Sequence, residues 1–188
     1  MDQEELMMYI EEAQEKMDHS LDHLKKELQK ISTGKANPAM VRDLQVNYYG
    51  TMTPMNQVAN ISTSDSRTLA IQPWEKSMLA PIEKSIFEAN LGVTPQNDGE
   101  IVRISIPPLT EERRKQLVKQ AKSLGEDAKV SIRNARRDIM EVIKKAVKDG
   151  YPEDEGKRQE ASINDMTTKH TNSVDQIFTS KEQDIMTI

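Results

Sequence analysis

The sequence predicts an α+β protein in which an elongated three-helix bundle carries a small inserted β/α/β domain. Long stretches near both ends place apolar residues in steps of three and four, the spacing of one helix face. The stretch between them changes to a shorter period and is punctuated by proline and glycine. The composition agrees, because 36% of the 188 residues are apolar and 30% are charged, and a slender bundle needs only a narrow apolar stripe on each helix.

The first expected element is a long amphipathic helix over residues 4–31. It should end before Gly34, because the Asn37-Pro38 step that follows disfavours helical backbone. The apolar side of this helix includes a repeat at Ile10, Met17, Leu24 and Ile31.

The next elements belong to the inserted domain. Loosely alternating, β-rich residues predict strands at 41–49, 68–72 and 101–106. Residues 74–91 have helical spacing and are followed by Gly92. Punctuation by Pro54, Asn60 and a serine cluster predicts turns from 50 to 66, and Pro95–Gly99 predicts another.

Two further helices complete the bundle. Thr110, followed by two glutamates, has the pattern of an N-cap for a helix over 110–149. Gly150 and Pro152 end that helix, and a third helix begins near Glu153. His170 falls on the apolar side of this last helix, so we expect it in the core.

The element order divides the chain into a discontinuous bundle domain and an inserted domain. Residues 1–31 and 106–188 form the bundle, and residues 32–105 form the insertion. Because the chain passes twice between them, relative motion is expected. The candidate hinge residues are Gly34, Lys35, Ala36, Ile106, Pro107 and Pro108.

The net charge of −5 hides a segregation along the chain. Residues 1–30, 31–109, 110–149 and 150–188 carry net charges of −5, −1, +5 and −4. On a helical wheel the basic residues of 110–149 fall within about 120° of one another, opposite the apolar stripe. The members of this basic stripe are Lys115, Lys119, Lys122, Lys129, Arg133, Arg136, Arg137, Lys144 and Lys148.

This stripe favours contact with a polyanion. It extends along about 50 Å of helix at 1.5 Å per residue, a length that fits repeating phosphates better than a small ligand. Arg133, Arg136 and Arg137 are the sharpest candidates, because guanidinium groups can fork onto neighbouring phosphates. The alternative is a solvated face, with some members paired to acids of the neighbouring helices.

Enzymatic chemistry has little support. The chain has no cysteine, which excludes disulfides, thiol nucleophiles and cysteine zinc sites. His19 and His23 lie one helical turn apart but lack a third ligand, so we expect no metal site. No glycine-rich phosphate loop occurs, and no cofactor is expected.

The acidic start and the lack of a long apolar run predict a cytoplasmic protein without a targeting or membrane segment.

Several motifs follow one another in a specific order. They are Ser32–Pro38, Tyr48-Tyr49-Gly50, Ile71–Trp74, Asn90-Leu91-Gly92, Asp98-Gly99, Ile106–Arg114, Arg133–Asp138 and Lys181-Glu182. In this combination the chain resembles the bacterial ribosome recycling factor family over essentially its whole length. The resemblance implies an L-shaped, tRNA-like protein of two domains joined by flexible linkers.

The resemblance also implies a function without enzymatic activity. A family member binds the post-termination ribosome and, with elongation factor G and GTP hydrolysis by that partner, splits it into subunits and releases it from mRNA. The bundle would lie on large-subunit rRNA, and the inserted domain would face the small subunit and the translocase. A monomer that binds neither membrane nor DNA is expected.

Residue roles carry over by position. Arg133, Arg136 and Arg137 would be the main rRNA contacts, supported by Arg113, Arg114, Lys115, Lys122 and Lys129. Two positions depart from the family pattern: Lys35 stands where arginine is frequent, and Thr168 where aspartate is frequent. Lys35 keeps the charge but loses the bidentate fork.

Two other classes of function compete with ribosome recycling. The same heptads could join several copies of the chain in a coiled-coil scaffold. An RNA-modifying enzyme would turn over substrate without a GTPase, but the sequence offers no residues for that chemistry.

Overall fold

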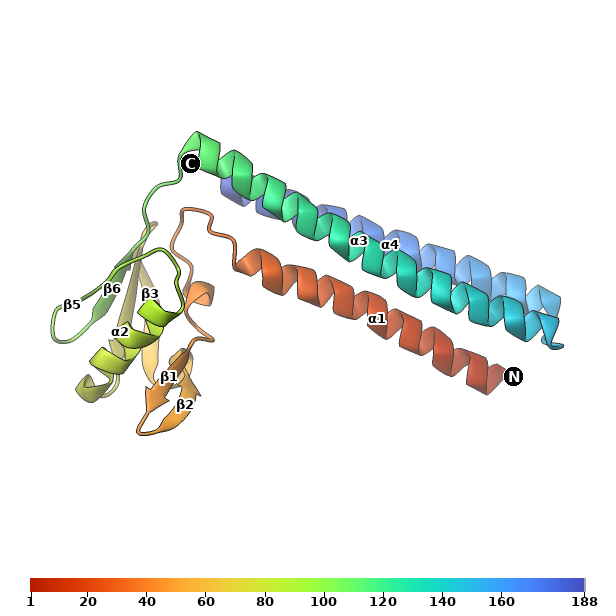
Figure 1. Ribbon diagram of the computed structural model, residues 1–188, viewed down its shortest axis with the longest axis horizontal. Coiled ribbons are helices and arrows are strands. Elements are labelled where there is room, and N and C mark those ends of the chain that lie inside the picture. The colour runs from red at the N-terminus through yellow and green to blue at the C-terminus, as the bar shows by residue number, and fades with distance from the viewer. Residues whose placement is uncertain (188) are drawn as a thin grey trace. The chain divides into compact units, whose positions relative to one another are not determined.

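The computed structural model describes residues 1–187 and confirms the α+β class. The chain forms two compact units (Figure 1). Met1–Ile31 and the segment from Lys115 onward form the bundle unit, and Ser32–Arg114 form the inserted unit. The second boundary thus follows Arg114, whereas the sequence pattern suggested a division after residue 105.

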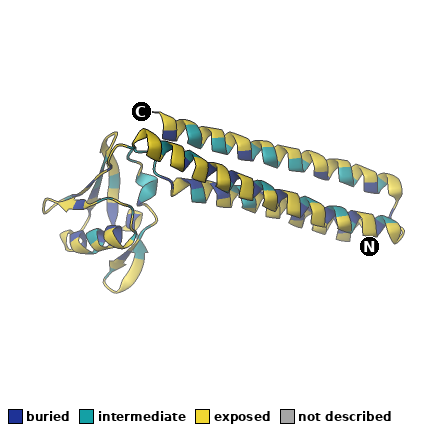
Figure 2. Ribbon diagram, turned by 45° about the horizontal axis from the view of Figure 1, so that its top comes forward, coloured by how far each residue is buried: buried dark blue, intermediate teal, exposed yellow. Residues whose placement is uncertain are grey.

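Three long helices build the bundle: α1 (Gln3–Gln29), α3 (Glu111–Lys148) and α4 (Glu153–Met186). Each buries one stripe against the other two, and Figure 2 shows dark, buried positions recurring along all three helices. Large side chains that are fully buried in this core include Leu6, Met17, Leu24, Ile132, Ile143 and Ile163. One chain therefore covers its own apolar stripes.

The helix ends are fixed by local hydrogen bonds. At the start of α1, Asp2 accepts from the backbone of Glu5, and Glu5 accepts in return from the backbone of Asp2, which is a capping box. Thr110 accepts from the backbone N–H of Arg113 at the start of α3, as the sequence predicts. Gly150 follows α3 with a φ of +107°, a conformation that glycine adopts without strain.

Two helical glycines of the bundle have opposite surroundings. A Cβ on Gly156 of α4 would lie 2.5 Å from Cγ2 of Val147, whereas a Cβ on Gly125 of α3 would meet Val174 Cγ1 at an ordinary 3.6 Å. Gly156 therefore allows α4 to approach the end of α3 closely.

Gly156→Ala is expected to destabilise the bundle by about 1–3 kcal/mol, because overpacking exceeds the gain in helix propensity. Gly125→Ala is the matched control and is expected to stabilise it by up to about 1 kcal/mol. Urea unfolding monitored by far-ultraviolet circular dichroism measures both changes. Val147→Ala should restore most of the loss in Gly156→Ala, and failure to do so would contradict the proposed clash.

The inserted unit is an antiparallel β structure with one helix. A hairpin of β1 (Gln45–Tyr48) and β2 (Thr51–Pro54) stands beside a four-stranded sheet in the order β3-β4-β6-β5. The sheet strands are β3 (Ala59–Asp65), β4 (Thr68–Pro73), β5 (Pro95–Asn97) and β6 (Val102–Ser105). Helix α2 (Leu79–Glu88) buries Leu79, Ile82 and Ile86 in the same core as the sheet residues Leu69, Ile71, Val102 and Ile104.

Several boundaries in this unit differ from the sequence prediction. The strand expected at 41–49 is limited to β1, because Pro38–Met40 forms a 3-10 turn before it. The polar stretch expected to form turns contains β2 and β3, and β3 tolerates its exposed serines because it lies at the sheet edge. The strand β5 begins at Pro95, also at an edge, and the start of an edge strand is a position that tolerates proline.

The helix expected at 74–91 is shorter than predicted. It begins only at Leu79, after an extended residue at Glu75 and a 3-10 turn over Lys76–Met78. Pro73 is the last residue of β4, so the residues after it first leave the sheet before they turn into α2.

The linker segments are partly anchored to the inserted unit. The backbone N–H of Ala36 donates to Ser66 O and that of Ile106 donates to Arg67 O, each at 2.8 Å. Both segments therefore meet the turn between β3 and β4. Gly34 has a φ of +75°, and a Cβ there would lie 3.2 Å from Cγ of Leu109. Gly34 and Leu109 thus lie close together, and both belong to the inserted unit.

Candidate nucleic-acid interface

The basic stripe lies on α3, opposite the buried stripe of that helix. Separations of three, four and seven residues bring its members to one side of the helix. The buried residues Leu117, Ala121, Ile132 and Ile139 occupy the other side. The exposed members are Lys115, Lys119, Lys122, Arg133, Arg137, Lys144 and Lys148.

Arg133 and Arg137 form the accessible centre of this surface. They are four residues apart, one helical turn, and both are exposed. Arg137 contacts the neighbouring Asp138 at 3.6 Å, an exposed pair of small energetic weight. Lys122 and Lys144 extend the exposed surface in the two directions along the helix. Together these side chains can contact successive phosphates of a polyanion.

Arg136 and Lys129 are partly covered by α4. The Nε of Arg136 donates to Oδ1 of Asn164 at 2.8 Å, and Nζ of Lys129 lies 2.6 Å from Oδ1 of Asp175. The Lys129 side chain is only 24% exposed. The alternative of internal pairing thus applies to these two members. Arg136 still has its terminal nitrogens, because a guanidinium carries five donors.

Two acidic residues of the α1 segment pair with nearby lysines of that segment. Lys16 contacts Glu12 within α1, and Lys30, the C-cap residue that follows the helix, contacts Glu27. The Lys30 contact lowers the pKa of Glu27. Both pairs lie on α1 and neither involves a member of the basic stripe.

The three basic residues at the start of α3 divide between the two compact units. Arg113 and Arg114 belong to the inserted unit, and Lys115 opens the part of α3 in the bundle unit. Nε of Arg114 is buried and has no hydrogen-bond partner within residues 1–187. The backbone N–H of Arg113 donates to the side chain of Thr110 in the cap of α3.

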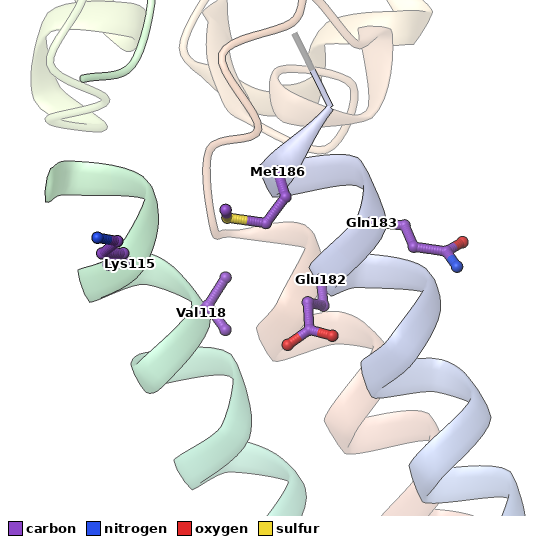
Figure 3. Close-up of a pocket in the computed structure, with 5 residues that line it drawn as sticks. All are labelled: Lys115, Val118, Glu182, Gln183 and Met186. Atoms are coloured by element: carbon purple, nitrogen blue, oxygen red, sulfur yellow. The ribbon is translucent and has the colours of Figure 1, made fainter. Parts of the chain in front are cut away.

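A shallow hollow lies between α3 and α4 at the end of the bundle that contains Lys115 (Figure 3). Its lining residues are Lys115, Val118, Glu182, Gln183 and Met186, around about 390 Å³. Figure 3 shows Val118 and Met186 directed toward the space between the helices. Burial lowers the pKa of the nearby Lys181. Lys115 and Glu182 are the charged residues of this lining, and Val118 and Met186 supply its apolar part.

One histidine links two helices of the bundle. No cluster of three or more potential ligands occurs within residues 1–187. His170 was expected in the core, and its side chain is only 11% exposed, with polar partners on both ring nitrogens. Its Nδ1 lies 2.7 Å from Met166 O, and its Nε2 lies 2.7 Å from Oδ1 of Asp18, so it links α4 to α1.

Sequence reasoning did not identify the α4 residues that flank the stripe. Asn164 and Asp175 are ordinary polar positions in the sequence, and only the side-by-side packing of α3 and α4 brings them to Arg136 and Lys129. No signal within a single sequence indicates this pairing. None of the helices formed by residues 1–187 combines the length and apolarity needed to cross a bilayer.

Known proteins share this architecture and sequence. The sequence model of a family described as "Ribosome recycling factor" matches residues 24–186. A ribosome-recycling factor of Phocaeicola vulgatus is 50% identical over 179 residues, which cover 95% of this chain and 96% of that protein. A solution structure of the ribosome recycling factor has a TM-score of 0.86 and 34% identity, with 100% of both chains covered.

A further structure shows such a factor within a larger assembly. It is described as models for the Thermus thermophilus ribosome recycling factor and the Escherichia coli elongation factor G bound to the E. coli post-termination complex. Its factor chain is 42% identical, has a TM-score of 0.67, and the match covers 96% of this chain and 98% of that one.

Proposed function

Because the chain belongs to the ribosome recycling factor family, we propose that it binds the post-termination ribosome through large-subunit rRNA and is driven by elongation factor G. The protein is a translation factor that acts in ribosome recycling and not an enzyme. The observation that carries the proposed rRNA contact is the exposed basic stripe of α3. GTP hydrolysis by elongation factor G supplies the energy, and the ribosome separates into subunits and leaves the mRNA.

The stripe residues have graded roles in this proposal. Arg133, Arg137 and Lys122 contact phosphate directly, because their side chains are exposed. Arg136 contributes its remaining donors while Asn164 fixes its orientation. Lys129 contacts phosphate less directly than the others, since its ammonium group already pairs with Asp175. Arg113, Arg114 and Lys115 support binding where α3 begins.

Of the six candidate hinge residues, four remain as the proposed sites of backbone rotation. Ala36 and Ile106 are hydrogen-bonded to the turn between β3 and β4, so they move with the inserted unit. Backbone rotation then concentrates at Gly34 and Lys35 on one linker and beside Pro107 and Pro108 on the other. Hinges of this kind absorb dihedral changes while the packed units stay rigid. We propose the bundle and the insertion as the two domains that move relative to each other.

The inserted unit is a surface for proteins more than for phosphate. Residues 31–109 carry a net charge of only −1, in contrast to the +5 of residues 110–149. This difference favours contacts with the translocase and with proteins of the small subunit. The coverage of all three apolar stripes within one chain supports a monomeric state. The proposed role takes place in the cytoplasm, where ribosomes are recycled.

A splitting assay tests the proposed function. Post-termination ribosomes are mixed with the protein and with elongation factor G and GTP, and light scattering follows the separation into subunits. Splitting is expected only with all three, and a non-hydrolysable GTP analogue should abolish multiple turnover. Splitting without elongation factor G, or none with it, would contradict the proposal. Scattering of the free protein distinguishes a monomer from a coiled-coil oligomer.

A further inference from the structure

The inserted unit exposes large aromatic side chains at one place. Tyr49 is 73% exposed and Trp74 is 66% exposed. The rings of Tyr48 and Tyr49 meet edge to face, with centroids 4.8 Å apart. Tyrosine and tryptophan are the residues most often found at the energetic centres of protein interfaces. Their gathering beside the β1–β2 hairpin indicates an interaction surface.

Tyr49 is held in an unusual backbone conformation. Its φ is +49°, and Gly50 follows with a φ of +90°, so both central residues of the hairpin turn are left-handed. Asparagine, aspartate or glycine are preferred at such positions. The strain is tolerated because the Tyr49 hydroxyl donates to Oε2 of Glu75 at 2.8 Å and lies 3.0 Å from Ser77 Oγ. A costly conformation held by specific contacts points to a function.

Glu75 supplies a negative charge between the aromatic residues. The Tyr48 hydroxyl donates to its Oε1 at 3.0 Å, while Tyr49 donates to its Oε2. The carboxylate raises the pKa of Tyr48, which keeps that phenol protonated as a donor. In the described part of the chain Glu75 forms no ion pair. Its carboxylate accepts hydrogen bonds from the two tyrosine hydroxyls and keeps its negative charge.

A hollow of about 280 Å³ opens beside these groups. Tyr48 and Trp74 provide aromatic walls, and Glu75 provides the carboxylate. The lining is completed by Thr53, Gln57, Val58 and Met78. We name this hollow the aromatic–carboxylate pocket. All its lining residues belong to the inserted unit.

We infer that the aromatic–carboxylate pocket receives an arginine or lysine side chain from a protein partner on the ribosome. A cation is attracted both by the faces of indole and phenol rings and by an unpaired carboxylate. The phosphates of a nucleic acid would be repelled by Glu75. The inference rests on the proposed function and gives the protein-facing surface of the inserted unit a specific chemistry.

Trp74 is the one tryptophan of the chain, so its fluorescence reports on this pocket. The full-length protein is titrated with an end-blocked tetra-arginine peptide, and the emission of Trp74 is recorded. A saturable change is expected, and Glu75→Gln should weaken it about tenfold or more. Glu100→Gln, an exposed carboxylate of the same unit outside the pocket, is the matched control and should bind as the wild type does.

Clear outcomes would overturn the inference. Equal affinity of the wild type and Glu75→Gln would show that the carboxylate does not select the occupant. An end-blocked tetraglutamine peptide that binds as well as tetra-arginine would show the same without any variant. A uridine oligonucleotide that saturates the Trp74 signal, when the basic peptide does not, would assign the pocket to nucleic acid. Circular dichroism confirms that Glu75→Gln is folded.

A ribosome experiment separates this inference from the proposed function. Glu75→Gln is expected to keep wild-type affinity for isolated large subunits and to split ribosomes severalfold more slowly with elongation factor G. An unchanged splitting rate would contradict a role of the pocket on the ribosome. If the wild type itself did not split ribosomes, the proposed function would fail, and the peptide titration would still decide what the pocket binds.

Discussion

Arg133→Ala combined with Arg137→Ala is expected to lower the affinity for isolated large ribosomal subunits about a hundredfold or more. Each guanidinium is exposed on the basic stripe, and a hydrogen bond to a charged group contributes about 1.5–3 kcal/mol. Equilibrium binding at several salt concentrations measures the effect. The slope of log affinity against log salt should fall in magnitude by about 1.5, because two phosphates are no longer neutralised.

The control for this double variant removes the same charge elsewhere. Lys145→Ala with Lys157→Ala changes two exposed cations that lie outside the stripe, on α3 and α4. Their loss should change the affinity less than about threefold at physiological salt. If both double variants weakened binding equally, net charge and not the stripe would govern binding. Arg136→Ala is less informative, because it also breaks the contact with Asn164.

Ile143→Ala is expected to destabilise the bundle by about 2–5 kcal/mol, the largest loss of stability among these variants. The side chain of Ile143 is fully buried, in a cluster with Leu6, Ile10 and Ile163 from the other two helices. A slender bundle has few other apolar groups that can move into the space left behind. Denaturant unfolding followed at 222 nm reports on the bundle, which contains most of the helix.

Val130→Ala is the matched control on the same helix. Val130 is 48% exposed, so its truncation should change the stability by less than about 0.5 kcal/mol. A loss below about 1 kcal/mol for Ile143→Ala would show that the three helices can close the cavity. Such a result would contradict the view that the slender bundle core has no other apolar groups able to fill the space.

The long helices were predictable to within two residues. The expected spans 4–31 and 110–149 compare with Gln3–Gln29 and Glu111–Lys148, and Glu153 begins α4 in both. A helix of this length repeats its apolar spacing many times, so the pattern is strong without tertiary information. Caps and breakers such as Thr110 and Gly150 act locally and are equally visible in the sequence.

The inserted unit was harder to predict because its strands are short and polar. β3 contains Ser62 and Ser64 on an edge that faces solvent, so its sequence looks like a loop. β5 has three residues and begins with a proline. Strand formation here depends on the pairing partner, which a single sequence does not reveal.

The candidate interface was predictable as a helix face but not as a set of contacts. The position of Arg133 and Arg137 on one side of α3 follows from helical periodicity alone. The covering of Arg136 by Asn164 requires α4 to lie beside α3. In the same way, Tyr49 and Glu75 are far apart in sequence and meet only through the folding of the inserted unit.

The anchoring of both linkers to one turn affects how the bundle can fold. Ala36 and Ile106 bind the adjacent residues Ser66 and Arg67, so the chain enters and leaves the inserted unit at neighbouring points. Once this unit is folded, α1 and α3 are joined by an effectively short loop, although Ser32–Arg114 separate the two parts of the bundle. Since loop-closure entropy grows with the length of flexible chain, prior folding of the insertion lowers the entropic cost of docking α1.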